Sequence, residues 1–319
     1  MPPALLDHLQ LHVSAALLDE LARESVDESL AVRDTILGVP VEGRARVTGK
    51  THLRLVPDAH RAVFEIVLQG AARSETNGRS PPVVIRSGAV TKFTLTKRFI
   101  LDNAGLVSQP ATCQAETHSV VTAVETEWPG MRGWLVRRLA WRRVQTSHDE
   151  ADAIAARHAE RDLSRSFDRR CAGLMEQANA LLASGWLRGH GGRARRLCFR
   201  TTHDRLYAGA TPANEAGDYR PQLPEAEHAA VLAVPVHAIG VSQSLELLGA
   251  WLREGAAGLA RELTGEPLSA EALAWLAQSA TAAEGLSAVP SLADGWFRLT
   301  LRPTAPPREK TLTIARRAP

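Results

Sequence analysis

A long stretch of charged sequence, from about His148 to Ala183, has the periodicity of one amphipathic helix. Small and apolar residues recur in it at steps of three and four, the spacing of a single helical face. These residues are Ala156, Ala159, Leu163, Phe167, Cys171, Leu174, Ala178 and Leu181. Ser184-Gly185 is a natural stop. We therefore expect one long helix that packs along a narrow stripe, holds Cys171 as a buried thiol and joins two halves of the chain.

Between Arg44 and Thr126 the period changes to two. In the run from Ala89 to Leu101 one face carries Phe93, Leu95, Phe99 and Leu101, interrupted only by Lys97. Such alternation predicts an antiparallel sheet with one apolar face and one solvated face. A strand of this length spans on the order of 40 Å at ~3.3 Å per residue, so we expect an elongated or strongly curled sheet.

Turn residues separate the predicted strands. They lie at Val56-Pro57-Asp58, Asn77-Gly78 and Asp102-Asn103-Ala104-Gly105. Before them, Leu9–Val13 is typical of a short strand, and Ser14 suits the N-cap of a Leu-rich helix. The simplest arrangement is a meander with this N-terminal helix on its apolar face.

The C-terminal part predicts mixed structure. Strands are expected at Arg196–Tyr207, Ala229–Val236 and Trp296–Arg302, helices at Ser242–Leu263 and Leu268–Gln278, and a closing hairpin strand at Lys310–Ala315. The fold class is therefore α+β: a long antiparallel meander packed on an N-terminal helix, a long central helix, and a second, smaller α+β unit. The expected divisions are 1–130, 131–185 and 186–319. The likeness of LQLHVSAALLDEL to VPVHAIGVSQSLELL suggests that the last unit is a diverged repeat of the first.

Composition excludes several classes of protein. The formal net charge is only +3, too small to imply a nucleic-acid partner by itself. The three cysteines lie far apart with no C-x-x-C pair, which predicts neither a disulfide framework nor a zinc site. We expect a soluble chain without cofactor or metal. The start of the chain has no secretory pattern, so cytoplasmic and envelope locations both stay open, as does the oligomeric state.

Two arginine clusters flank the long helix. In Trp128–Arg143, five arginines and no acids alternate with three tryptophans, and the predicted contact residues are Trp134, Arg137, Arg138, Trp141, Arg142 and Arg143. The glycine-rich turn Gly185–Arg196 adds Arg193, Arg195 and Arg196. Trp with Arg suits the headgroup zone of a membrane or stacking on single-stranded nucleic acid. The simpler interpretation is buried Trp with solvated Arg, because the stretch is short.

Catalytic patterns are weak. His148 with Asp152 and His158 with Asp162 stand at helical i, i+4 spacing, which solvated ion pairs explain. Ser242 lacks the second glycine of a nucleophile elbow, and His12 and His237 each end a predicted strand, as core histidines also do. We therefore do not expect an enzyme.

Three runs, PPVVIRSGAVTKFTLTKRFILDNAGL, LAWRRV and IAARHAERDLSRSFD, together resemble a family of bacterial proteins without assigned activity, found mainly in planctomycete-type genomes. The pattern is also similar, more loosely, to tubular lipid-binding (TULIP-like) domains, in which a long antiparallel sheet wraps an amphipathic helix. The leading functional expectation is a non-enzymatic binding or envelope-associated protein, which holds a lipid-like amphiphile between sheet and helix or engages an anionic surface through the arginine clusters. The alternatives are a scaffold without a small ligand, an enzyme of another class and a nucleic-acid binder.

Overall fold

The computed structural model describes residues 10–183, 195–212, 229–235, 286–293, 296–303 and 310–312. One sheet contains strands β2 (Glu24–Ile36), β3 (Val39–Val56), β4 (Ala62–Ser80), β5 (Val83–Asp102), β6 (Gly105–Ser108), β7 (Thr112–Thr126) and β13 (Lys310–Leu312). The other contains β1 (Gln10–Ser14), β8 (Arg195–Thr201), β9 (Arg205–Pro212), β10 (Ala230–Pro235), β11 (Leu286–Ala293) and β12 (Trp296–Pro303). The helices are α1 (Ala15–Ala22), α2 (Gly130–Thr146) and α3 (His148–Ala183).

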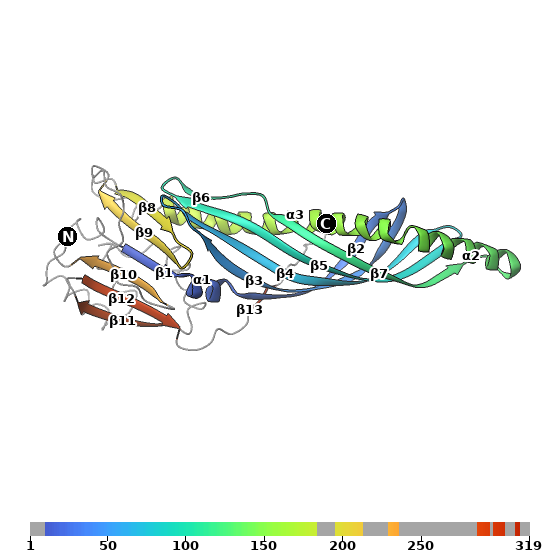
Figure 1. The fold of residues 1–319 in the computed structure, drawn as a ribbon, viewed down its shortest axis with the longest axis horizontal. Coiled ribbons are helices and arrows are strands. Elements are labelled where there is room, and N and C mark those ends of the chain that lie inside the picture. The colour runs from blue at the N-terminus through green and yellow to red at the C-terminus, as the bar shows by residue number, and fades with distance from the viewer. Residues whose placement is uncertain are drawn as a thin grey trace.

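The molecule is an elongated rod (Figure 1). The seven-stranded sheet has the order β13-β2-β3-β4-β5-β6, with β7 also beside β5, and the six-stranded sheet has the order β11-β12-β10-β1-β9-β8. The α3 helix runs along the seven-stranded sheet, and α2 lies at the end of the rod farthest from the six-stranded sheet. We call this end the distal end. The α+β class is confirmed in its broad form, but the sheets dominate the structure.

The sequence patterns place most of the long elements correctly. The central helix has the bounds that the apolar periodicity predicts, His148–Ala183. The strand expected at Ala89–Leu101 forms most of the 20-residue β5, so the expected elongation of the sheet is confirmed. The turn expected at Asn77-Gly78 is wrong, because these residues pair with Arg86 and Ile85 inside β4 and β5. The chain reverses instead at Pro81-Pro82, where proline has no N–H to continue the ladder.

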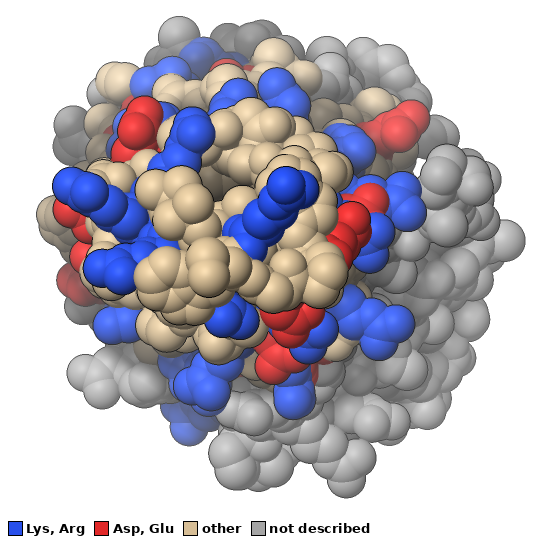
Figure 2. All heavy atoms as spheres, turned by 90° about the vertical axis from the view of Figure 1, so that its right-hand side faces the viewer, with Lys and Arg blue, Asp and Glu red and all other residues tan. Residues whose placement is uncertain are grey.

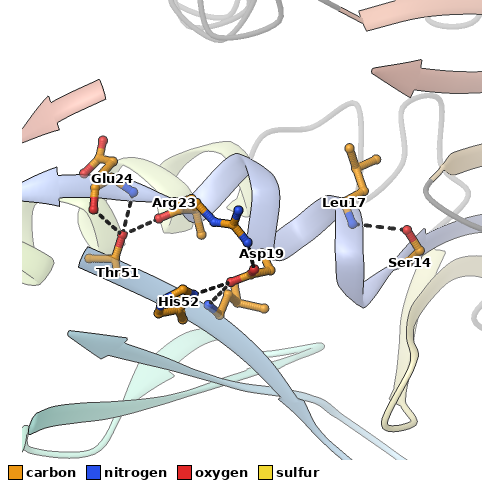
Figure 3. A network of polar contacts seen from close by, with 9 residues as sticks. Ser14, Leu17, Asp19, Arg23, Glu24, Thr51 and His52 are labelled. Atoms are coloured by element: carbon orange, nitrogen blue, oxygen red, sulfur yellow. Dashed lines mark hydrogen bonds and ion pairs between the residues drawn. The ribbon is translucent and has the colours of Figure 1, made fainter. Parts of the chain in front are cut away.

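The position expected for the N-terminal helix is also wrong. The α1 helix lies beside the end of β3, at Thr51 and Leu53, and the chain then continues into β2, which pairs with the rest of β3. Its Asp19 carboxylate accepts a hydrogen bond from the Leu53 N–H at 2.8 Å and pairs with Arg23, and Thr51 donates to the Ala22 carbonyl at 2.6 Å (Figure 3). The predicted cap is confirmed, since the Ser14 hydroxyl accepts from the Leu17 N–H. Polar side chains thus bind α1 to the strand edge, and the apolar face is left to α3.

The α3 helix covers the apolar face with part of its predicted stripe. Leu163 and Phe167 pack on a core formed by β2, β3, β4 and β5, with Phe93 and Leu95 at its centre. Cys171 is buried, as expected, but Leu174 is 64% exposed. The packed face advances in steps of four, from Leu163 through Phe167 and Cys171, and this rotation turns Leu174 toward solvent.

Segments from the N-terminal and C-terminal parts of the chain contribute strands to both sheets. Lys310–Leu312 pairs parallel with Glu24–Val26, so the expected closing hairpin is wrong. At the junction the Thr201 hydroxyl donates to the Val56 carbonyl at 2.6 Å and accepts from the Val63 N–H at 3.2 Å. Beside it, Ala62 packs on Leu197 and Phe199. The expected single strand Arg196–Tyr207 is a hairpin of β8 and β9.

Several expectations fall on residues that the structure does not describe. The helices expected at Ser242–Leu263 and Leu268–Gln278, His237, Arg193 and most of the glycine-rich turn lie outside the described ranges. The proposed repeat and the domain limits 1–130, 131–185 and 186–319 stay predictions.

Candidate functional site

The inner face of the seven-stranded sheet, which faces α3, changes character along the rod. Side chains in register across β2, β3, β4, β5 and β7 form successive layers. Nearer the six-stranded sheet this face carries large buried residues such as Leu68, Phe93 and Leu95. A layer formed by Glu28, Val47, Ala72, Thr91 and Thr117 follows, in which the two threonine hydroxyls are 2.9 Å apart.

The next two layers toward the distal end consist mostly of small side chains. They are formed by Leu30, Ala45, Ser74, Ala89 and Ser119, and by Val32, Gly43, Thr76, Ser87 and Val121. All ten are only half-buried although they face α3. The opposing stretch of α3 is also small, with half-buried Ala155, Ala156 and Ala159. We call these ten sheet residues the small-residue section. Small side chains of the sheet thus face small side chains of α3 in this section, whereas the face around Phe93 carries large ones.

Acidic side chains of α3 hold the helix along β7, from the small-residue section to the start of that strand. Asp152 accepts from the Ser119 N–H at 3.1 Å, Glu160 from the Ala115 N–H at 2.9 Å, and Asp168 from the Ala111 N–H at 3.0 Å. Eight helical residues advance about 12 Å and four strand residues about 13 Å, so the two repeats match. An edge strand exposes a row of N–H groups that would otherwise pair with another chain. The acids therefore fix α3 on β7 and protect that edge.

The other side of α3 reaches β2. His158 Nδ1 lies 2.7 Å from the Asp34 carboxylate, so its predicted pairing with Asp162 is wrong. The predicted His148–Asp152 pair is present at 3.8 Å. Lys97, the one charged interruption in the apolar strand, points inward and its ammonium lies 2.5 Å from Asp168. The helix thus bridges the two edges of the curled sheet.

One buried acid lies at the inner limit of the small-residue section. Glu28 is 6% exposed, and neither of its carboxylate oxygens has a hydrogen-bond partner. Burial raises the pKa of Glu28, and the nearby Arg170 guanidinium only partly opposes this. The section therefore combines aliphatic side chains on β2 with hydroxyls on β4, β5 and β7, and ends at a carboxyl group.

The α2 helix at the distal end carries most of the Trp/Arg candidates. Trp134 is 49% exposed, and Arg137, Arg138, Arg142 and Arg143 are all exposed. Trp141 is half-buried. The sequence analysis missed the exposed apolar residues Met131, Leu135 and Leu139. Their i, i+4 spacing was the available signal, since it defines a stripe of its own.

The second arginine cluster does not join the first. Arg195 and Arg196 begin β8, in the sheet at the other end of the rod, and Arg196 is exposed. The intervening 36-residue helix spans about 54 Å at 1.5 Å per residue. One compact anionic ligand therefore cannot contact both clusters.

The histidine and cysteine candidates lie in packed surroundings. His12 is 3% exposed, and burial, aided by the Arg205 charge, lowers its pKa to about 4. Burial raises the pKa of Cys113 and of Cys171 to about 11, so both are protonated thiols at neutral pH. Within the described ranges no three His, Cys, Asp or Glu side chains are placed to hold a metal ion. In the same part of the chain, no helix combines the length and hydropathy that a membrane span requires.

Comparisons with known proteins give a structural neighbour only. No protein-family model and no curated protein matches the sequence. Among solved structures, the chain is similar to a lipopolysaccharide binding protein with 11% sequence identity and a TM-score of 0.38. The match covers 71% of this chain and 57% of the other, so this chain spans little more than half of that protein's length.

Proposed function

We propose that this protein is a non-enzymatic binding protein that holds a lipid-like amphiphile between the sheet and α3, in the small-residue section. The observation that carries the proposal is the half-burial of ten inner-face residues under a helix that is itself lined with alanine there. A sheet and a helix that pack directly on each other bury this face fully, as they do around Phe93 and Leu95.

The lining selects an amphiphile over a purely apolar ligand. Leu30 and Val32 provide an aliphatic wall on β2, and Ser74 and Ser87 bring hydroxyls from β4 and β5. From Val47, in the layer of Glu28, to Gly43 in the far layer the section is about 13 Å long at ~3.3 Å per residue. An acyl or similar chain would lie along the aliphatic wall, with its polar groups toward the serines and, at the inner limit, Glu28.

The proposal is tested by filling the section. Ala89→Trp places an indole on the inner face, whereas Val90→Trp places the same group one residue away on the outer face, where Val90 is 38% exposed. We expect native mass spectrometry of the purified protein to show a bound amphiphile, and a fluorescent fatty-acid probe to bind. Ala89→Trp should weaken probe binding at least about tenfold, and Val90→Trp should leave it within about twofold.

Equal effects of the two variants would contradict the proposal, as would an absence of both bound amphiphile and probe binding. Thermal unfolding by circular dichroism shows whether Ala89→Trp is folded. The smaller Ala45→Leu change serves if it is not.

The alternative is an interaction protein without a small ligand. The exposed apolar residues of α2 favour it, because such surfaces mark sites of association. Binding of a partner by a ligand-free protein, unchanged in Ala89→Trp, distinguishes the two functions.

A further inference from the structure

We infer that α2 docks the protein onto an anionic lipid surface. This inference rests on the distal surface alone and holds whether or not an amphiphile occupies the small-residue section. Its basis is an exposed apolar stripe, a surrounding set of arginines, and a helix whose packing does not use either.

The apolar stripe faces solvent along α2. Met131 is 85% exposed, Leu135 52% and Leu139 59%, at positions i, i+4 and i+8 of one helix. The side of α2 that carries Val136, Ala140 and Val144 is half-buried against the protein. The α2 helix therefore has two apolar sides. Among the described residues, one side packs against the protein, and the side with Met131, Leu135 and Leu139 stays exposed.

The first turn of α2 packs closely on the backbone that follows β7. Gly133 is buried, and a side chain there would collide with the Trp128 carbonyl and approach Thr126. This close approach fixes α2 against the end of β7. Because Met131, Leu135 and Leu139 take no part in it, they can be replaced without removing the packing that holds the helix.

The charge around the stripe has one sign. Arg132, Arg138, Arg142 and Arg143 flank it, and no acidic residue occurs between Trp128 and Ser147. Seen from the distal end, uncharged surface is bordered mostly by Lys and Arg, with Asp and Glu fewer (Figure 2). Apolar residues inserted among lipid chains, with guanidinium groups at the phosphates, form the pattern of a helix that lies in a membrane interface.

The same details argue against nucleic acid. A base stacks on an aromatic face, and the Arg138 guanidinium covers one face of the Trp134 ring at 5.3 Å from its centroid. Leu135 and Leu139 have no aromatic ring on which a base could stack, whereas both side chains can insert among the lipid chains of a bilayer. A lipid surface can contact both the exposed apolar side chains and the arginines on this side of α2.

The test is co-sedimentation of the full chain with vesicles of phosphatidylcholine alone or mixed with phosphatidylglycerol. We expect binding to the anionic vesicles only, decreasing with added salt, together with a blue shift of tryptophan fluorescence. Arg138→Ala/Arg142→Ala should weaken binding about 30-fold, from about 1 kcal/mol for each arginine near the surface. Leu135→Ser/Leu139→Ser should weaken it by at least about tenfold.

Matched controls lie elsewhere on the seven-stranded sheet. Val120→Ser removes an equally exposed aliphatic residue from the outer face of β7, and Arg73→Gln removes an exposed arginine from β4. Both should bind anionic vesicles as the unaltered protein does. Ala89→Trp should also bind them normally, so failure of the amphiphile proposal and failure of this one are separable.

Three results would overturn the inference: no vesicle binding, equal binding to neutral vesicles, or equal losses in the α2 variants and the controls. Retention of single-stranded oligonucleotides or of a protein partner through α2, without vesicle binding, would replace the membrane by that class of partner.

Discussion

The ion pair between Lys97 and Asp168 gives the sharpest test of how α3 is held on the sheet. The Lys97 side chain is 4% exposed, and its ammonium contacts the Asp168 carboxylate at 2.5 Å and the Gln109 carbonyl at 3.0 Å. The same carboxylate oxygen accepts from the Ala111 N–H at 3.0 Å. Asp168→Ala therefore removes the counter-charge of a buried cation and the acceptor of the Ala111 N–H, just before β7, in one step.

The expected cost follows from the burial of the two partners. Removing one member of a fully buried ion pair costs roughly 3–5 kcal/mol. Here Asp168 is 36% exposed, and Lys97 retains the Gln109 carbonyl, so the lower end of that range applies. We expect Asp168→Ala to lower the free energy of unfolding in urea by about 3 kcal/mol with an unchanged slope.

Two further variants make this result decisive. Asp162→Ala removes an exposed acid from the same helix and should cost less than about 0.5 kcal/mol. Lys97→Met combined with Asp168→Leu leaves no unpaired charge and should recover to within about 1 kcal/mol of the unaltered protein. If Asp168→Ala costs no more than Asp162→Ala, the pair does not hold α3. If the double variant is no more stable than the single one, the cost is not that of an uncompensated buried charge.

Three other predictions concern single contacts. The pKa of His12 is lowered to about 4 in the folded protein, so on acidification the unfolded chain binds a proton at this residue before the folded chain does. The free energy of unfolding should therefore fall by about 3 kcal/mol as pH drops from 6.5 to 4. Urea titrations of His12→Phe should lack this part of the pH dependence. Burial raises the pKa of Glu65, but hydrogen bonds from Arg98 and Arg54 outweigh it and leave the pKa lowered. Glu65→Gln should therefore cost about 2 kcal/mol at neutral pH and progressively less as acid protonates the native carboxylate, and an equal loss at both pH values would refute this. Ser14→Ala removes the cap of α1 and the acceptor of the Ala229 N–H, and should cost about 1–2 kcal/mol in thermal unfolding, with exposed Ser29→Ala on β2 as a control.

The extent of α3 and the apolar face of β5 could be read from the sequence because both follow from local periodicity. A helix repeats every 3.6 residues and a strand every two, so the spacing of Leu163, Phe167 and Cys171, or of Phe93, Leu95 and Phe99, states which side is buried. Ser14 was identifiable for the same reason, since a cap bonds a backbone group three residues away.

The predictions that proved wrong concern contacts between segments that are distant in the sequence. The pairing of Asn77-Gly78 with Arg86 and Ile85 overrode a strong local turn signal, because β5 continues the ladder to Pro81-Pro82. His158 contacts Asp34, which is 124 residues away in sequence, and not Asp162, which is one turn along its own helix. The parallel pairing of β13 with β2 joins residues near both ends of the chain, and nothing in Lys310–Leu312 signals it.

The candidate site shows the same division. Composition and spacing located the Trp/Arg stretch and predicted that it could face an anionic surface, and they also assigned the inner face of the sheet. Only the tertiary structure decided that Met131, Leu135 and Leu139 stay exposed, that the two arginine clusters lie at opposite ends of the rod, and that Ala45, Ser74 and Ala89 stand in one layer opposite the alanines of α3. The physical reason is that periodicity along the chain determines which residues share a face, whereas strand register and helix placement determine what that face meets.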